Sequence, residues 1–408
     1  MVREALRDQN IYIYTSETAK KNMRILFALP GLHLFNRGAE VAFISVAREL
    51  AKLGENVTLI GSGLAHKAAP YRFLHARSIS REFFESFPFV PGLRNEFSYE
   101  DLTFLPGLLQ RYRPAQYDVT LTCSFPFTSL GLRRPPLSGF RPAHVFVTQN
   151  GDWPAYARNS ENRLFSCDGL ICTNPDYYER NRARWRCSLI PNGVDCDRFK
   201  PGPSQREKLG LPPQRLVILM VSALDPTKRV QQGIEAVSKI PDAHMVVAGD
   251  GPLRDEIDRL ASKLLPNRFT RLKLAPDNMP MLYQSSDIFL HLSQIELFGN
   301  VFLEAMACGL PIIGFDSSRT RWIVGDSEHL IREDDPALIA AQIGVARIET
   351  KDKRLLRTER AAKFAWNKVA EQYQHFLREV SARSDRDQRK PSSRSASDHS
   401  SNGPRSSA

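Results

Sequence analysis

The sequence predicts an α/β protein with two doubly wound, Rossmann-like parallel sheets. Strand-like and helix-like segments alternate from residue 24, and a second series of the same kind begins near residue 216. Alternation at this length is typical of parallel sheets covered by helices. Gly and Pro accumulate between the two series, in the segment 192–213, which is typical of a domain boundary. Because ligands bind beyond the carboxyl ends of such strands, we expect two domains facing each other across a cleft.

The first series opens with RILFAL (24–29), which reads as a buried strand, and NVTLI (56–60) reads as the next one. Between them lies a segment with apolar residues at helical spacing and a glycine at its end, which predicts a helix. Those residues are Val41, Ile44, Ala47, Leu50 and Leu53, followed by Gly54.

The stretch 73–134 mixes Arg with Phe and Pro and shows no clean period. We interpret it as an irregular insertion that packs its Phe residues inward. A surface for lipid head groups or for an acceptor is the alternative, because aromatic and cationic residues together suit an interface.

The second series predicts a longer alternation of the same kind. Strands are expected at 216–222, 244–249, 272–275, 287–293 and 311–315, and helices from Val230, from Leu253 and near 280–285. This order again indicates a parallel sheet with helical crossovers.

Composition describes a globular enzyme, with 42% hydrophobic and 25% charged residues among 408. The net charge of +11 suits nucleic acid, an anionic membrane or phosphorylated substrates, and part of it lies in the Ser-, Arg- and Pro-rich tail 384–408, which we expect to be disordered. We therefore expect no nucleic-acid partner. The DRD triplet (385–387) in that tail lacks the fixed geometry that a metal needs.

No apolar run reaches the length of about 18 residues that a membrane helix needs, and the first 22 residues have no signal-peptide core. We expect a cytoplasmic protein, with contact at the inner face of the membrane left open. The six cysteines form no CxxC pair and are expected to be reduced thiols without chemistry.

Two phosphate-binding motifs are absent. The first turn reads PGLHLFNRGAE rather than G-x-G-x-x-G, which argues against a dinucleotide dehydrogenase. The Walker sequence G-x-x-x-x-G-K-[ST] does not occur, which argues against kinases and ATPases.

The segment QIELFGNVFLEAMACGLPI (294–312) contains the strongest site signal. Gly299 and Asn300 stand where a loop becomes the first turn of a helix, whose unpaired amides and positive dipole end favour a pyrophosphate. Glu304 on that helix would then accept hydrogen bonds from ribose hydroxyls, and Glu296 would accept them from a sugar beyond the phosphates. The alternative for Glu304 is a first-turn carboxylate that the helix dipole and an arginine stabilise.

Four segments together resemble the retaining glycosyltransferases of family four (group 1), which have the GT-B fold. They are E-x(7)-E from Glu296 to Glu304 with AMACGLP after it, LIPNGVDCDRFKP (189–201), VVAGDGP (246–252) and FAWNKVAEQYQHF (364–376). The resemblance implies a nucleotide diphosphate sugar as donor, an acceptor on the first domain, and no metal or other cofactor.

The resemblance also implies five parts of the chain. They are an extension at 1–22, an acceptor-binding domain at 23–195, a nucleotide-sugar-binding domain at 196–360, a helix at 361–383 that returns to the first domain, and the tail at 384–408.

By position, the resemblance makes Lys228 the cation that neutralises the diphosphate. It places the backbone of Phe298, Gly299 and Asn300, with Val301 after them, on the donor. A lysine that merely starts a helix is the alternative for Lys228. Gly38 matches a glycine near acceptor and phosphates, with a simple helix start as the alternative.

Three positions depart from the family pattern. Ala223 or its neighbour stands where the family has a diphosphate arginine, and Arg229 is the candidate replacement. Gln149 stands where the family commonly has a histidine, and it cannot take a proton. Asp152, three residues on, could bind sugar or acceptor, or simply cap a turn. Arg321 stands near the place of a family glutamate, as an extra cation for the diphosphate or as a mark of a specialised site.

We therefore predict a retaining, metal-independent hexosyltransferase that uses a UDP- or GDP-sugar and a glycan or lipid-linked acceptor, in polysaccharide biosynthesis or glycolipid synthesis. A catalytically weak partner subunit that binds sugar nucleotides or glycans is the alternative, because of the three departures. An epimerase or phosphorylase of the same fold is a third.

Overall fold

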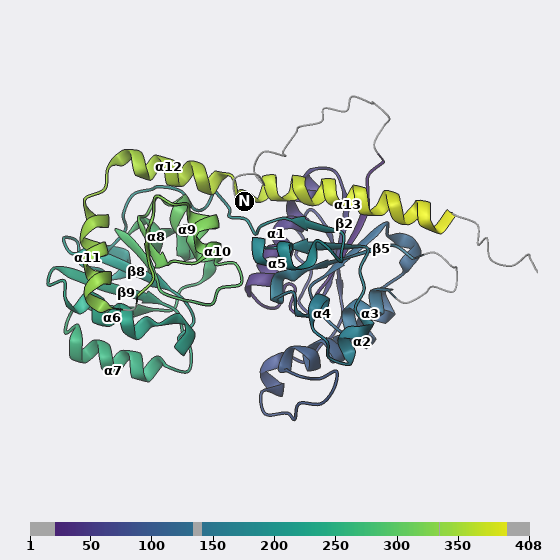
Figure 1. Ribbon diagram of the computed structural model, residues 1–408, viewed down its shortest axis with the longest axis horizontal. Coiled ribbons are helices and arrows are strands. Elements are labelled where there is room, and N and C mark those ends of the chain that lie inside the picture. Colours follow the sequence, from purple (N-terminus) through teal and green to yellow (C-terminus); the bar gives the residue numbers. More distant parts are fainter. Residues whose placement is uncertain (1–20, 134–140, 334, 390–408) are drawn as a thin grey trace, which may run out of the picture.

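Two separate parallel sheets form the framework of the molecule (Figure 1). The computed structural model describes residues 21–133, 141–333 and 335–389. Within these residues every ladder between named strands is parallel, in one sheet of seven strands and one of six. The prediction of two doubly wound sheets is confirmed.

The first sheet has the order β3-β2-β1-β4-β5-β6-β7. Its strands are β1 (Arg24–Ala28), β2 (Asn56–Gly61), β3 (Arg72–His75), β4 (Val119–Thr122), β5 (Ala143–Val147), β6 (Gly169–Cys172) and β7 (Cys187–Leu189). Its helices are α1 (Gly38–Lys52), α2 (Glu96–Arg111), α3 (Phe127–Arg133), α4 (Trp153–Tyr156) and α5 (Pro175–Asn181).

The second sheet has the order β10-β9-β8-β11-β12-β13. Its strands are β8 (Leu216–Val221), β9 (Ala243–Ala248), β10 (Phe269–Leu272), β11 (Ile288–His291), β12 (Ile312–Phe315) and β13 (His329–Ile331). Its helices are α6 (Val230–Ser238), α7 (Arg254–Leu264), α8 (Met279–Gln284), α9 (Asn300–Ala307), α10 (Ser318–Val324), α11 (Pro336–Arg347) and α12 (Lys351–Ala362).

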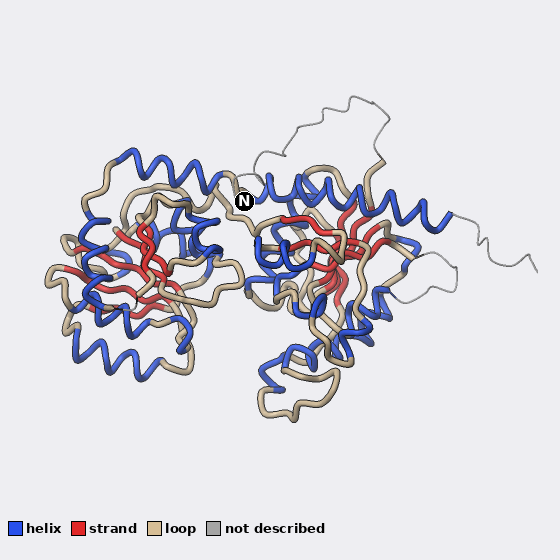
Figure 2. Tube along the Cα trace, viewed as in Figure 1, coloured by secondary structure: helices blue, strands red, loops and turns tan. Residues whose placement is uncertain are grey.

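The last helix, α13 (Trp366–Arg389), belongs to the first domain. Figure 2 shows the chain crossing from the end of α12 over the second sheet to α13 beside the first. Tyr373 and Leu377 of α13 are buried in the core between the first sheet and α1. Glu55, at the end of the turn after α1, accepts hydrogen bonds from Gln374 and from the amide of Met23, so it ties α13 to the start of β1.

The segment that returns from the second domain to the first packs closely against residues 193–194. An isolated parallel bridge pairs Val194 with Ala365, and a Cβ on Gly193 would lie 2.6 Å from the ring of Trp366. The glycine of the NGVD segment is therefore required by the close approach of the returning chain.

Several local expectations need correction. The strand expected at 272–275 is β10 (Phe269–Leu272), an edge strand whose residues are all partly exposed, so its sequence shows no buried apolar run. Val41 and Leu53 lie on the exposed side of the α1 region, because the helix buries a face centred on Phe43 against the sheet and α13. The tail expected from 384 begins later, since α13 extends to Arg389, and residues 390–408 lie outside the described part.

The stretch 73–134 is also more regular than expected. It contains α2, α3 and β4, and β4 is a central strand beside β1. β4 has only four residues, two of them Thr, and a pattern this short does not identify a strand in the sequence. Its phenylalanines divide: Phe84 and Phe104 are buried, but Phe83 and Phe89 are 64% and 66% exposed, so the inward packing expected for all of them is wrong.

The extension expected at 1–22 falls almost wholly on residues 1–20, outside the described part. The described residues contain no helix that is both long and apolar enough to span a bilayer.

Candidate active site between the two domains

A cavity of about 650 Å³ opens between the two sheets, at their carboxyl edges. In the first sheet it is lined after β1 and β4, and in the second after β8 and β11. These are the two places where the strand order reverses, which is where open α/β sheets bind ligands. The cleft expected from the sequence is thus present, with walls from both domains.

The start of α9 forms one end of this cavity. Gly299 has φ 87° and ψ 57°, a left-handed conformation that glycine adopts without strain, and a Cβ there would lie 2.9 Å from the ring of Phe302. Asn300 and Val301 follow and also line the cavity. Within the described residues their backbone amides have no hydrogen-bond acceptor. Two free donors at the positive end of a helix make an anion site.

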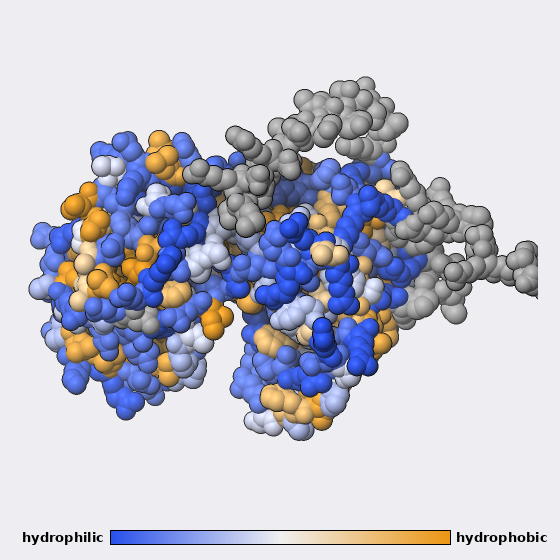
Figure 3. Space-filling view, viewed as in Figure 1, coloured by the Kyte–Doolittle hydropathy of each residue, from blue (hydrophilic) through white to orange (hydrophobic). Residues whose placement is uncertain are grey.

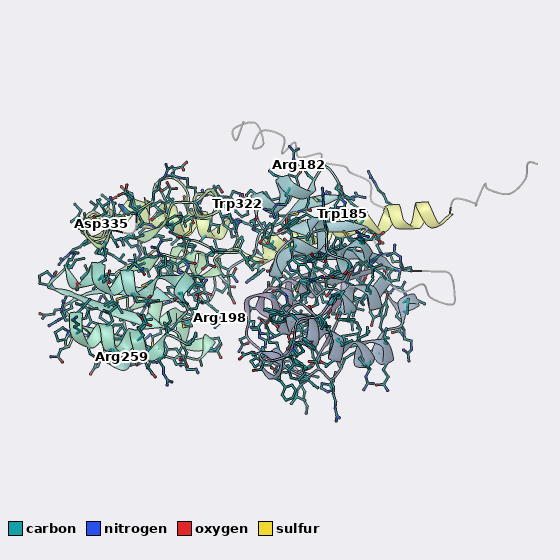
Figure 4. The ribbon with its side chains drawn as sticks, turned by 60° about the horizontal axis from the view of Figure 1, so that its bottom comes forward. Arg182, Trp185, Arg198, Arg259, Trp322 and Asp335 are labelled. Carbon is teal, nitrogen blue, oxygen red and sulfur yellow. The ribbon has the colours of Figure 1, made fainter. Side chains whose placement is uncertain are left out.

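Phe298 contributes its backbone position rather than its ring. The residue is 95% buried and its ring meets Trp322 edge-on at 6.1 Å between centroids. Figure 4 places Trp322 on the second domain, at the side that faces the first. This packing fixes the loop that leads into α9.

Glu296 lies next to this anion site with two donors on one oxygen. Nζ of Lys228 is 2.5 Å from Oε1, and Nε2 of His291 is 2.9 Å from the same atom. Within the described residues Oε2 has no partner, so it can accept hydrogen bonds from a ligand. Burial raises the pKa of Glu296, but the hydrogen bond and charge of His291 and the charge of Lys228 outweigh it and hold the pKa at about 2.

His291 is a site residue that the sequence reasoning missed. It is the last residue of β11 and only 2% of it is exposed, with its ring 5.0 Å from that of Phe302. A polar residue inside the apolar segment IFLHLS was the available signal. Its Nε2 is the ring nitrogen that contacts Glu296, and its Nδ1 is buried without a hydrogen-bond partner among the described residues.

Glu304 lies one turn beyond Asn300 on α9 and does not line the cavity. The hydroxyl of Tyr283 donates to its Oε2 at 2.8 Å. Burial raises the pKa of Glu304 to about 7, although the Tyr283 hydrogen bond and the charge of Arg198 lower it. Figure 4 shows Arg198 at the side of the second domain that faces the first. Glu304 thus lies one helical turn beyond the cavity lining, is hydrogen-bonded to Tyr283, and has a pKa near neutral pH.

A chain of amides joins the two domains through Gln149. Its Nε2 donates to Oδ1 of Asn192 at 2.5 Å, and Nδ2 of Asn192 donates to Oδ1 of Asn300 at 3.0 Å. All three residues line the cavity. A side-chain amide can donate one hydrogen bond and accept another, so amide side chains such as that of Gln149 can form a chain of this kind. Gly38, at the start of α1, lies across the cavity, where a Cβ would be 3.8 Å from the Asn300 side chain.

Three expected residues lie elsewhere. Asp152 is 98% buried, and its carboxylate accepts from Asn181 at 2.7 Å and from Arg180 at 3.0 Å rather than lining the cavity. Arg229 also does not line it. Its φ of 59° is a left-handed backbone conformation that residues other than glycine rarely adopt.

Arg321 binds Asp316 and Asp326, away from the cavity, so its expected role as a diphosphate cation is not supported by its position. Arg319 does not line the cavity either. It donates to Asp176 of the first domain at 2.6 Å and to the carbonyl of Glu296 at 2.5 Å. The arginine therefore links the first domain to the backbone of Glu296 in the second. Ala223 does line the cavity, and it brings no charge.

The wall from the first domain carries buried carboxylates. Glu40 and Glu100 line the cavity and are 4% and 5% exposed, and Arg37 lies 3.7 Å and 3.2 Å from them. Burial raises the pKa of both. Such groups suit a ligand with many hydroxyls. The described residues hold no group of three or more side chains placed to bind a metal.

Comparisons with known proteins agree with this geometry. The family model described as Glycosyltransferase Family 4 matches residues 36–198, and that described as Glycosyl transferases group 1 matches residues 202–363. The chain is 31% identical over 227 residues to D-inositol 3-phosphate glycosyltransferase of Corynebacterium jeikeium, covering 50% of this chain and 54% of that protein. It is 24% identical over 327 residues to the sulfoquinovosyl transferase SQD2 of Arabidopsis thaliana, covering 73% of this chain and 60% of that protein.

The chain spans about half the length of the first of these curated relatives. Among solved structures, sucrose-phosphate synthase of Thermosynechococcus elongatus superposes with a TM-score of 0.68 and 20% identity, over 89% of this chain and 100% of that one. HepE of Anabaena, solved with UDP and glucose, superposes with a TM-score of 0.65 and 20% identity, over 88% and 100%. The two family models on the two halves, together with the two facing sheets, show that the chain belongs to the group 1 glycosyltransferases of the family-four type.

Proposed function

We propose that the protein transfers a hexosyl group from a UDP- or GDP-sugar to a glycan or lipid-linked acceptor, with retention of the anomeric configuration and without a metal. One observation carries the proposal. The free amides of Asn300 and Val301, the ammonium of Lys228 and the open Oε2 of Glu296 meet in one cavity between two domains. The solved complexes of HepE with UDP and with UDP-glucose support a donor of this class.

In this proposal the diphosphate binds at the start of α9. The helix end and Lys228 stabilise the negative charge that develops as the bond to the sugar breaks, without a metal. Lys228 must then turn from Glu296 toward the phosphates, while His291 keeps Glu296 in place. Oε2 of Glu296 accepts hydrogen bonds from the sugar, and Glu304 accepts them from the ribose.

The acceptor binds on the first-domain wall in this proposal. Glu40 and Glu100 accept hydrogen bonds from its hydroxyls, and burial raises the pKa of both carboxyls. Retention is carried over from the family resemblance. An NMR measurement of the anomeric coupling in the first product formed tests it, and an inverted product would refute it.

Aromatic side chains beside the cavity support an acceptor with an apolar part. Phe97 lines the cavity and is 41% exposed, and Phe83, Phe87 and Phe89 are exposed rings of the same stretch 73–134. Figure 3 shows apolar residues at the tip of the part of the first domain that projects beside the cleft. A cytoplasmic enzyme that works at a membrane surface would present such rings to a lipid-linked acceptor.

The experiment compares transfer and donor hydrolysis for a panel of UDP-, GDP- and ADP-sugars in wild type, Glu296→Gln and Lys228→Gln. Sugar transfer by wild type with loss in both variants supports the proposal. Wild-type protein that binds a donor tightly and releases no sugar with any acceptor supports the alternative, a binding subunit. Ala223, which brings no cation to the diphosphate, is the observation that favours that alternative.

A further inference from the structure

A second cavity lies on the opposite edge of the second sheet. Its volume is about 660 Å³, and it is lined where β8, β11 and β12 begin, by Arg215, Asp287 and Pro311 among others. The donor cavity lies where β8 and β11 end. The two cavities are therefore separated by the length of the strands, and the second one is distinct from the site assigned to the donor.

The lining of this second cavity is strongly basic. Six cations contribute to it against two carboxylates, Asp287 and Glu349. The cations are Arg206, Arg215, Arg347, Lys351, Arg354 and Arg357. Both carboxylates are already paired. A guanidinium nitrogen of Arg206 lies 2.6 Å from Asp287, and Glu349 pairs with Nε2 of His329 at 2.6 Å and with Arg357.

Three of the six cations have no acidic partner or hydrogen-bond acceptor among the described residues. They are Arg215, Lys351 and Arg354, whereas Arg347 is paired with Asp242 at 2.7 Å. Nη1 of Arg215 is buried as well as unsatisfied. A buried guanidinium donor without an acceptor is costly, which indicates that an anion or another acceptor completes the site.

The start of α12 adds to this positive potential. Lys351, Arg354 and Arg357 recur at three-residue spacing on this helix of twelve residues and all line the cavity. Thr350 caps the helix without a side-chain hydrogen bond, so the first turn keeps its free amides. The stem of Arg354 packs on Gly309, where a Cβ would lie 2.6 Å from Cγ, and this packing holds the side chain at the cavity.

We infer that this second cavity is a binding site for a small phosphorylated anion, separate from the donor. The start of α12 with Lys351 and Arg354 takes the phosphate, and Arg215, just before β8, adds its positive charge to the lining. The cavity is concave and of small-molecule size, which favours a phosphorylated metabolite over a flat macromolecular surface. The inference is independent of the donor chemistry proposed for the cleft.

The test is a calorimetric titration of pyrophosphate into the full chain. Wild type is expected to bind at two sites, and Lys351→Gln with Arg354→Gln is expected to weaken one of them at least tenfold. Lys228→Gln should weaken only the other. The matched control is Arg259→Gln, an exposed arginine of α7 that lines neither cavity and lies far from the first domain in Figure 4. That control should bind as wild type does.

Arg215→Gln provides an independent variant outside α12, and it should also weaken the second site. In the Lys228→Gln background, a further change of Lys351, Arg354 or Arg215 should weaken the remaining pyrophosphate binding. The inference is overturned if pyrophosphate affinity stays the same after that further change. It is equally overturned if the Lys228→Gln variant binds no pyrophosphate. Both results leave the donor proposal standing, because that proposal depends on the comparison of wild type with the Lys228→Gln variant alone.

Discussion

Nε2 of His291 lies 2.9 Å from Oε1 of Glu296, from a ring that is almost fully buried at the end of β11. Nζ of Lys228, from the segment after β8, lies 2.5 Å from the same oxygen. In the proposed function Lys228 turns to the diphosphate, which leaves His291 as the partner of Glu296. The relationship makes His291 a positioning residue for the proposed sugar ligand.

His291→Leu should therefore lower kcat about tenfold or more, since a hydrogen bond to a charged group contributes about 1.5–3 kcal/mol. His291→Gln keeps a donor near the same place and should recover much of the loss. Steady-state kinetics with a saturating donor measures both variants. Equal rates in wild type and His291→Leu at equal thermal stability would exclude the positioning role.

Glu296→Gln separates sugar binding from diphosphate binding. The change removes the ion pair that occupies Lys228 in the empty site, so affinity for the nucleoside diphosphate alone should stay equal or rise. The extra affinity that the sugar provides should be lost, and transfer should fall at least tenfold. Calorimetry with UDP or GDP and with the matching sugar nucleotide makes the comparison. A large loss of nucleotide affinity would place Glu296 on the diphosphate instead.

The raised pKa of Glu304 predicts pH-dependent donor binding. Burial raises this pKa from 4.5 to about 7, so below pH 7 the carboxyl is mostly protonated in the empty protein. The ionised form accepts ribose hydrogen bonds better, so donor affinity should rise as pH increases toward about 7 and then level off. A sugar nucleotide is the right probe, because its diphosphate does not titrate in this range. Glu304→Gln should give a flat profile, and an unchanged slope in that variant would refute the assignment.

The same shift has a stability consequence of the opposite sign. A carboxyl whose pKa is raised on folding stabilises the folded state most below about pH 4.5, and the contribution is lost as pH rises through about 7. Thermal unfolding of wild type and Glu304→Gln over this range should show the variant gaining stability relative to wild type as pH rises.

Asp152→Asn should affect stability rather than transfer. The buried carboxylate holds Arg180 and Asn181, and losing one buried partner costs about 1–3 kcal/mol. Denaturant unfolding measures the loss, and kcat/KM per folded molecule should change less than twofold. A specific loss of kcat in a fully stable variant would restore the sugar- or acceptor-binding role that the sequence suggested for Asp152.

Gly193→Ala should disturb the point where α13 returns to the first domain. The new Cβ would lie 2.6 Å from the Trp366 ring and 2.9 Å from the carbonyl oxygen of Phe364, and backbone cannot move aside cheaply. Overpacking of this kind costs about 1–3 kcal/mol. Gly344→Ala, which lies inside α11 and meets nothing within 4 Å, is the comparison variant; it should lose no stability and should gain up to about 1 kcal/mol, because alanine favours the helix over glycine.

The sequence alone determined the two sheets, the place of the cleft and the segment from Glu296 to Glu304, because each depends on local patterns: strand-helix alternation, a glycine at a helix start, and a fixed spacing of two acids. Gly299 and Asn300 were found for the same reason, Lys228 was found only through the family resemblance, and the structure brings all three to one cavity.

Only the tertiary structure decided which charges face that cavity. Asp152 and Arg321 stand in promising sequence positions, yet Arg180 and Asp316 neutralise them elsewhere. Arg319 and His291 stand in unremarkable positions and reach Glu296. Arg180 and Arg319 come from elements 28 and 23 residues away from Asp152 and Glu296, so no short segment contains both partners. Asp316 with Arg321 and His291 with Glu296 are each five residues apart, but only the folded backbone decides that their side chains point toward one another.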